Sequence, residues 1–308
     1  MSIVGGAPIE SDARMDPSWT RACPWLAAVL FASVIVQFVG ALVRFVTIGG
    51  SPATSNADPL GALPATPSYS YSLYDGMHWV RPAFFVALAL TAVLGGIIAN
   101  RPSRSSLAFV SGFSAYSLAS TIYLTLWFRV SSDLGPGFFL TLAGLAMVAL
   151  VGISAVVMLR PFARPAILPG ARIVSLGALS ALALGVSTTI YDLRIPFGPL
   201  ASFTPLTFRS AITATIAFFA IAASPLVAVR LGGRVGSYLL FGLATVTSIR
   251  VIDAVLRRFG NWRGLPVSAH LTVGWWIEIL AIVLLLATAR QLRLTDPDTV
   301  AAASDART

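Results

Sequence analysis

The sequence contains no lysine and only one cysteine, and each of these shortages excludes a group of functions. All 21 basic residues are arginines. Without lysine, the chain cannot form the Schiff base of a retinal protein or of a pyridoxal phosphate enzyme, and it cannot build a lysine-containing phosphate loop. A single cysteine, Cys23, permits neither an intramolecular disulfide nor a multi-cysteine metal site. We expect Cys23 to behave as a small apolar residue.

Charged residues are also scarce. They make up 11% of the 308 residues, whereas hydrophobic residues make up 56%. Soluble domains contain about 25% charged residues, and disordered chains have low hydrophobicity, so both classes are excluded. Apolar runs of about 18–23 residues are long enough to cross a membrane as helices. The sequence therefore predicts an all-α, polytopic transmembrane helical bundle.

Eight apolar runs divide the chain. They lie at Pro24–Thr47, Val80–Ala99, Leu107–Phe128, Phe138–Leu159, Ile173–Thr189, Ser210–Val229, Gly236–Leu256 and Leu271–Leu292. This division predicts a cytoplasmic N-terminal tail (1–23), a first four-helix half (24–159), a cytoplasmic linker (160–172), a second four-helix half (173–292) and a cytoplasmic C-terminal tail (293–308).

The arginines indicate an orientation. With the N-terminus inside, the inner segments contain Arg14, Arg21, Arg101, Arg104, Arg160, Arg164, Arg172, Arg230, Arg234, Arg290, Arg293 and Arg307, and the inner loops contain no acid. Because cytoplasmic segments are enriched in basic residues, both termini are expected in the cytoplasm. We expect a bacterial inner-membrane protein. Arginines scattered beside apolar runs argue against a nucleic-acid partner; the expected partners are the lipid bilayer and other membrane subunits.

The two halves show signs of a tandem repeat. Arg81-Pro-Ala opens the second run and Arg209-Ser-Ala opens the sixth, while Phe139-Leu-Thr-Leu in the fourth resembles His270-Leu-Thr-Val in the eighth. These spacings predict a four-plus-four duplication, as in other membrane bundles built from parallel repeats. Small residues on three runs predict close helix packing, because they let backbones approach in lipid. They are Ser111, Ser114, Ser117 and Thr121; Gly144 and Gly152; and Gly177, Ala181 and Gly185.

One group of charged residues is predicted to lie inside the membrane. Arg250 lies seven residues before the outer end of the seventh run, and Glu278 lies seven residues after the start of the eighth. At 1.5 Å per residue, both should lie roughly 10 Å below the outer boundary and meet. Asp253 is on the same face as Arg250. A charge in lipid costs about 2.5–3.5 kcal/mol, so the group is either a structural ion pair or a proton relay or anion site. Arg44 and Arg209 are further polar candidates.

The two histidines, His78 and His270, are each predicted at the outer start of a helix. Imidazole there could bind haem iron or transfer protons, and Asp75 could orient His78. Alternatively, Ser72 and Asp75 form a capping box that starts the second helix, with His78 at the membrane interface. No metal-binding motif with zinc-ligand spacing is present, and no catalytic motif was found.

The chain resembles haem A synthase in three places. Gly40-Ala-Leu-Val-Arg-Phe-Val-Thr-Ile-Gly-Gly50 is similar to a Gly-Ala-x-Val-Arg-x-Thr-x-Ser-Gly stretch of that family, with one extra residue before Thr47. Asp75-x-x-His78 resembles a Glu-x-x-His motif, and His270 falls where the family has a histidine on the eighth helix. The resemblance implies a haem-binding oxidoreductase with His78 and His270 as haem ligands and Asp75 as an acid.

The chain also departs from that family. Phe138-Phe139 and Phe208-Arg209 stand where the family has histidines, and the cysteine pair of the first outer loop is missing. The sequence therefore favours a non-enzymatic membrane protein, either a carrier of a small molecule or lipid or an accessory subunit of a complex. A degenerate haem-binding oxidoreductase and a structural scaffold are the alternatives.

Overall fold

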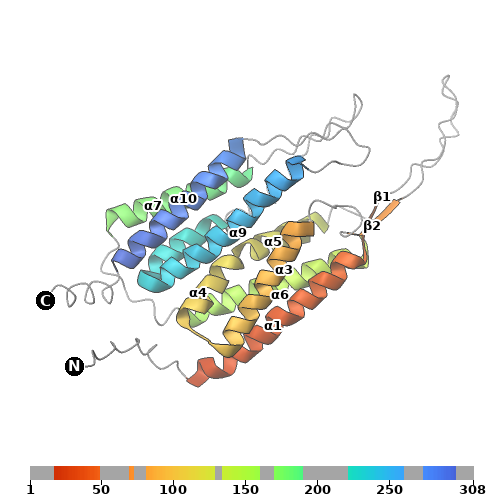
Figure 1. Ribbon diagram of the computed structural model, residues 1–308, viewed down its shortest axis with the longest axis horizontal. Helices are drawn as coiled ribbons and strands as arrows, with labels where there is room; N and C mark the ends of the chain where they lie inside the picture. The colour runs from red at the N-terminus through yellow and green to blue at the C-terminus, as the bar shows by residue number, and fades with distance from the viewer. Residues whose placement is uncertain are drawn as a thin grey trace, which may run out of the picture.

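The computed structural model is a set of packed helices with one short two-stranded ribbon (Figure 1). It describes residues 17–48, 69–72, 81–128, 134–159, 170–189, 221–259 and 273–295. The helices are α1 (Pro17–Leu42), α3 (Arg81–Asn100), α4 (Arg104–Phe113), α5 (Ala115–Phe128), α6 (Pro136–Leu159), α7 (Ala171–Thr189), the segment Ile221–Leu231, α9 (Gly233–Phe259) and α10 (Val273–Leu294). The strands are β1 (Arg44–Ile48) and β2 (Tyr69–Ser72), which pair antiparallel.

Three of these helical segments are long and apolar enough to cross a membrane: Ala22–Leu42, Pro136–Leu159 and Gly233–Ile252. Shorter apolar helices are Phe84–Asn100, Ala171–Gly185 and Ile221–Leu231. Large apolar side chains face outward on the long helices, among them Ile35 and Leu150, which are 64% and 61% exposed. Lipid rather than water is the favourable environment for such a surface, so the structure supports a membrane protein.

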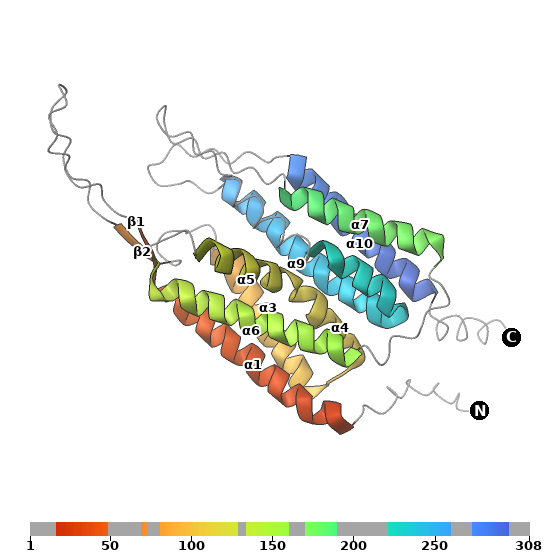
Figure 2. The same cartoon turned by 180° about the vertical axis from the view of Figure 1, so that it is seen from behind.

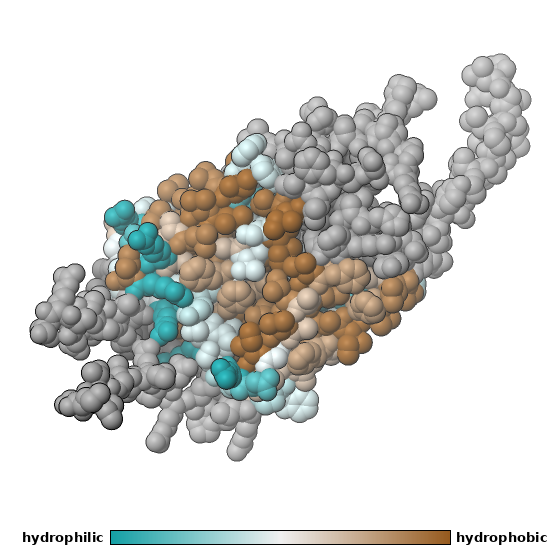
Figure 3. All heavy atoms as spheres, viewed as in Figure 1, coloured by the Kyte–Doolittle hydropathy of each residue, from teal (hydrophilic) through white to brown (hydrophobic). Residues whose placement is uncertain are grey.

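The surface is divided along the length of the helices. In Figure 3 hydrophobic residues cover the middle of the visible face and hydrophilic residues gather at one end. The described arginines at the helix ends on that side are Arg101, Arg104, Arg172, Arg230, Arg234, Arg290 and Arg293. Within the described residues the only acids are Asp253 and Glu278, and both lie on helices near the opposite end. One end is therefore strongly basic.

The helices form two groups that pack in equivalent ways (Figures 1 and 2). In the first group α1 packs on α6 and α3, and α6 also packs on α4 and α5. In the second, α7 packs on α10, and α10 also packs on α9. Gly177 of α7 faces Val229 of the Ile221–Leu231 helix, so α7 contacts that helix as α1 contacts α3.

The two groups meet where α4 crosses α9, and glycines make this crossing close. A Cβ on Gly112 of α4 would collide with the Leu239 carbonyl of α9, and a Cβ on Gly242 of α9 would collide with the Phe109 carbonyl of α4. The two contacts are reciprocal: each glycine faces a carbonyl of the other helix. Phe109 and Leu239 are also separated by the same number of residues as Gly112 and Gly242. The crossing thus has approximate two-fold symmetry.

Small residues lie at the expected packing seams within each group. A Cβ on Gly144 would meet the Gln37 side chain of α1, and one on Gly152 would meet the Ser114 hydroxyl. Gly177 and Gly185 of α7 both face the Ile221–Leu231 helix. The prediction of close packing is confirmed for Gly144, Gly152 and Gly177, whereas a Cβ on Gly185 would make only an ordinary contact with Ala222.

Two helix boundaries differ from the sequence prediction. The first helix ends at Leu42, not Thr47, and Arg44 lies on β1 rather than within a span. The segment Arg44–Ile48 is rich in β-branched and aromatic residues, which favour a strand, and it pairs with Tyr69–Ser72. Ser72 therefore ends a strand, and α3 begins at Arg81, so Ser72 does not cap that helix. The first helix also begins earlier than predicted, at Pro17, so that Pro24 is internal.

The predicted third run, Leu107–Phe128, is two helices with an interruption at Ser114. The Ser114 hydroxyl donates to the Ser111 carbonyl at 2.9 Å. The backbone stays hydrogen-bonded across this boundary, because the Ser114 amide donates to the Val110 carbonyl and the Leu118 amide donates to the Ser114 carbonyl. At its other end α4 begins with an unpredicted capping box, in which the Ser103 hydroxyl accepts from the Ser106 amide.

Candidate functional site

Glu278 is the only fully buried charged residue in the described part of the chain, with 0% exposure. It lies in the second turn of α10, on the face that also contains Ala281, Leu285 and Leu292. These buried residues recur every three or four positions, so one stripe of α10 points inward. Glu278 is buried because it occupies a position on that apolar stripe.

Arg250 comes to Glu278 from the adjacent helix α9. It continues an inward stripe formed by Leu240, Leu243 and Thr247, which are all fully buried. Its guanidinium Nη1 lies 3.4 Å from Glu278 Oε1, and its side chain is 30% exposed while that of Glu278 is not exposed at all. The structure thus brings together two residues that the sequence placed at equal depth on consecutive antiparallel helices.

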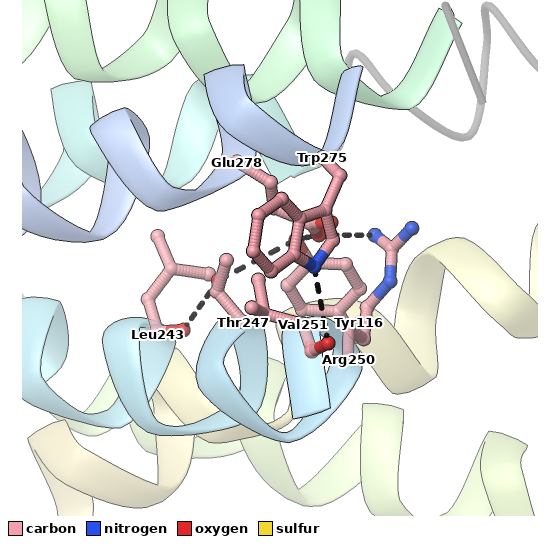
Figure 4. A network of polar contacts seen from close by, with 7 residues as sticks. All are labelled: Tyr116, Leu243, Thr247, Arg250, Val251, Trp275 and Glu278. Atoms are coloured by element: carbon pink, nitrogen blue, oxygen red, sulfur yellow. Dashed lines mark hydrogen bonds and ion pairs between the residues drawn. The ribbon is translucent and has the colours of Figure 1, made fainter. Parts of the chain in front are cut away.

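Tyr116 joins the pair from α5, on the other side of the junction between the two helix groups (Figure 4). Its hydroxyl donates to Glu278 Oε1 at 3.5 Å, and the Arg250 guanidinium stacks over its ring at 4.6 Å from the centroid. The Thr247 hydroxyl donates to the Leu243 carbonyl at 2.8 Å and lies 3.4 Å from the Tyr116 hydroxyl. We call Tyr116, Thr247, Arg250 and Glu278 the buried polar cluster.

Trp275 lies one helical turn before Glu278 on α10. Its indole Nε1 donates to the Val251 carbonyl of α9 at 3.2 Å (Figure 4). This bond ties α10 to α9 beside the ion pair. The indole N–H is the only polar group of the tryptophan side chain, and the rest of the ring is apolar. Tryptophans of this kind are common near membrane interfaces.

The Glu278 carboxylate is poorly satisfied for a buried group. Both contacts to Oε1 are longer than the ~2.7–2.9 Å of a strong charge-assisted hydrogen bond. Its other oxygen, Oε2, is buried and has no hydrogen-bond partner among the described residues. Arginine can bind both oxygens of a carboxylate at once, so a purely structural lock would be expected to show that arrangement. The cluster instead leaves one acceptor open.

The other predicted site residues are not in this cluster. Asp253 lies on α9 three residues after Arg250, but its side chain is outside the described residues. Asp75, His78, Arg209 and His270 are also outside them. Arg44 lies on β1, which follows α1 directly and is not part of the cluster. Within the described part, no group of three or more histidine, cysteine, aspartate or glutamate residues is placed to hold a metal ion.

Comparisons of the chain with family models, with curated proteins and with solved structures gave no match. The functional argument therefore depends on the geometry of the chain itself.

Proposed function

We propose that the protein is a non-enzymatic membrane carrier of a small molecule or lipid, and that the buried polar cluster is the element that changes partners during transport. The supporting observation is the half-satisfied Glu278 carboxylate, which lies where the two helix groups meet and takes contacts from both. Carriers commonly alternate between two arrangements of one repeat against the other around a site at their interface.

The proposal includes an architecture. The chain forms an eight-helix bundle made of two four-helix halves related by duplication, which the symmetric contacts of Gly112 and Gly242 support. The basic end lies in the bacterial cytoplasm with both termini, which the arginines at that end support.

The cost of burial supports a functional role for the cluster. An unpaired polar atom in an apolar environment costs about 1–3 kcal/mol, and more when it is charged. Such a cost is retained when the group has another partner in another state, whereas a structural pair is more stable when fully bonded. Moving α5 relative to α9 and α10 would exchange Tyr116 for a different donor without breaking any helix.

Two vesicle assays test the proposal. The purified protein is reconstituted in liposomes loaded with the pH dye pyranine, and in liposomes containing a fluorescent phospholipid that dithionite bleaches from outside. We expect flux above empty liposomes in at least one assay. Glu278→Gln should reduce that flux roughly tenfold, since a hydrogen bond to a charged group contributes about 1.5–3 kcal/mol.

Thr141→Val is the matched control. The Thr141 hydroxyl is also buried without a partner among the described residues, but it packs against Gly40 of α1 and not against the cluster. Flux in this variant should equal that of the unmodified protein. Absence of flux in correctly folded protein would overturn the carrier proposal: co-purifying chains would then favour an accessory subunit, and a Soret absorption band would favour a haem-binding oxidoreductase.

A further inference from the structure

A cavity of about 170 Å³, open on one side, lies beside the boundary between α4 and α5. Its walls come from α4 and α5, from α6, from the Ile221–Leu231 helix and from α9. Ser114 is ten residues into the α4–α5 run, so at 1.5 Å per residue the cavity lies roughly 15 Å from the basic end, near the middle of a ~30 Å hydrocarbon layer. It is separate from the buried polar cluster, none of whose residues line it.

Small side chains create this space. Gly152 of α6 faces Ser114 and Ala149 lines the same wall, while Ala223 and Ser224 line the wall from the other helix group. The cavity thus lies beside the boundary between α4 and α5, where the backbone remains hydrogen-bonded from the Ser114 amide to the Val110 carbonyl.

The cavity wall offers one hydroxyl with a free hydrogen-bonding capacity. Ser111 is 7% exposed and lines the cavity, and its hydroxyl makes no hydrogen bond within the described part of the chain. The neighbouring Ser114 hydroxyl already donates to the Ser111 carbonyl, so it can still accept a bond but not donate another. The Ser111 hydroxyl faces the cavity in mainly apolar surroundings, and a ligand with a polar group would give it a hydrogen-bond partner.

We infer that this cavity binds a neutral, aromatic-sized molecule with one hydrogen-bonding group. Every side chain lining it is uncharged, which excludes an ionic ligand. The volume would hold a molecule about the size of benzene, which an enclosed engineered cavity of about 150 Å³ binds. The polar group would bond the Ser111 hydroxyl, and the apolar body would contact the alanine and leucine side chains.

This inference deepens the proposed carrier function and rests on it for its biological meaning. Ala115 lines the cavity, and the next residue, Tyr116, contacts Glu278. A single turn of α5 therefore connects the ligand site with the buried polar cluster.

The test measures equilibrium binding of phenol and benzene to the full chain in phosphatidylcholine nanodiscs, by saturation-transfer difference NMR with empty nanodiscs as background. Benzene has the apolar body without the hydroxyl. We expect saturable binding, with phenol bound about fivefold more tightly, the effect of one net hydrogen bond. Ser111→Ala should reduce phenol to the affinity of benzene.

Two further variants make the test specific. Ser248→Ala is the matched control, because Ser248 bonds its own helix at Ala244 and does not line the cavity; phenol binding should not change. Ala223→Leu places a larger side chain at the exposed rim and should weaken both probes at least about fivefold. Folding of each variant is checked by protection of the buried Cys23 thiol from a reactive dye.

Equal affinity for phenol and benzene, absence of saturable binding, or binding that Ala223→Leu leaves unchanged would each overturn the inference. Equal affinity would point to a groove for lipid acyl chains. Because binding is measured without transport, loss of the site and loss of carrier activity are distinguishable: phenol binding with no flux would overturn only the carrier proposal.

Discussion

The Arg250–Glu278 ion pair is expected to contribute to folding stability, because it lies in the low-dielectric interior of the helices. A surface pair contributes about 0–1 kcal/mol, but removing one partner of a buried pair leaves a charge that water cannot reach. Glu278 is fully buried, whereas the Arg250 side chain is 30% exposed and retains some access to its surroundings. The loss of the arginine should therefore harm the fold more than the loss of the glutamate.

A double-mutant cycle on this pair tests the contact. We expect Arg250→Ala to lower the free energy of unfolding by about 2–3 kcal/mol, because it leaves the Glu278 carboxylate buried with only Tyr116. The double variant Arg250→Ala/Glu278→Ala should be less destabilised than the sum of the two single variants by about 1 kcal/mol or more. Unfolding is followed by dye labelling of Cys23, which is the only cysteine and is buried.

The control cycle pairs Arg250→Ala with Thr141→Val, since Thr141 packs against α1 instead of the cluster. These two changes should be additive. Additivity in the Arg250–Glu278 cycle as well, within about 0.5 kcal/mol, would argue against their contact.

The sequence predicted part of this cluster. Equal depth on consecutive antiparallel helices was enough to pair Arg250 with Glu278, because charges in an apolar helix are rare and conspicuous. Tyr116 and Thr247 could not be found in this way: tyrosine and threonine are common in apolar helices, and Tyr116 is 162 residues from Glu278. Their role depends on how the two helix groups dock, which local patterns do not encode.

At the scale of single elements, hydrophobic length predicted where helices lie but not how they end. The predicted run Phe138–Leu159 is α6, Pro136–Leu159, because its apolar residues continue without interruption. The predicted end of the first helix was wrong, because the apolar residues of the helix continue into a strand rich in β-branched residues. Hydrophobicity alone does not distinguish a helix from a strand. The boundary at Ser114 could not be predicted, because the residues on both sides of it are equally apolar and the serine stripe indicated only packing.

The close crossing of α4 and α9 predicts which glycines cannot be replaced. Gly112→Ala and Gly242→Ala would each push a methyl group into a carbonyl of the facing helix. We expect each to lower the free energy of unfolding by about 1–3 kcal/mol, the usual cost of overpacking. The measurement is the denaturant midpoint for Cys23 labelling.

Gly96→Ala is the matched control on α3, because a Cβ there would meet nothing within 4 Å. This variant should be neutral, or stabilised by up to about 1 kcal/mol through better helix propensity. If Gly112→Ala and Gly242→Ala behaved like Gly96→Ala, the helices would not cross as closely as the structure has them.

At the scale of the whole molecule, the proposed repeat has more support in the contacts than in the sequence. The sequence similarities between the halves are short, and the step from Arg81 to Arg209 differs slightly from the step from Phe139 to His270. The crossing of α4 and α9 instead relates Phe109 to Leu239 and Gly112 to Gly242 by one constant step along the chain. Apolar helices resemble one another by composition, so the reciprocal contacts are the better support for the proposed repeat.

The polar features do not follow this approximate symmetry. The sequence separation between Gly112 and Gly242 also separates Val148 from Glu278, and Ser120 from Arg250. The residues of the first half that correspond to the ion pair are therefore uncharged. One half of the molecule therefore contributes the charged pair, and the other contributes Tyr116 and most of the cavity wall. This division gives the junction two different chemical sides, which relative movement of the halves could expose to different partners.

The basic end of the molecule makes a prediction about its orientation. Arg101, Arg230 and Arg290 lie at or near the ends of helices that run toward this end, and α10 ends there. Cytoplasmic segments of membrane proteins are enriched in arginine, so this end is expected in the cytoplasm. A fusion of alkaline phosphatase after Thr308 should be inactive, whereas a fusion truncated after Phe259, one crossing earlier, should be active outside. The reverse pattern of activity would place the basic end outside and would require the buried polar cluster to be near the cytoplasmic side.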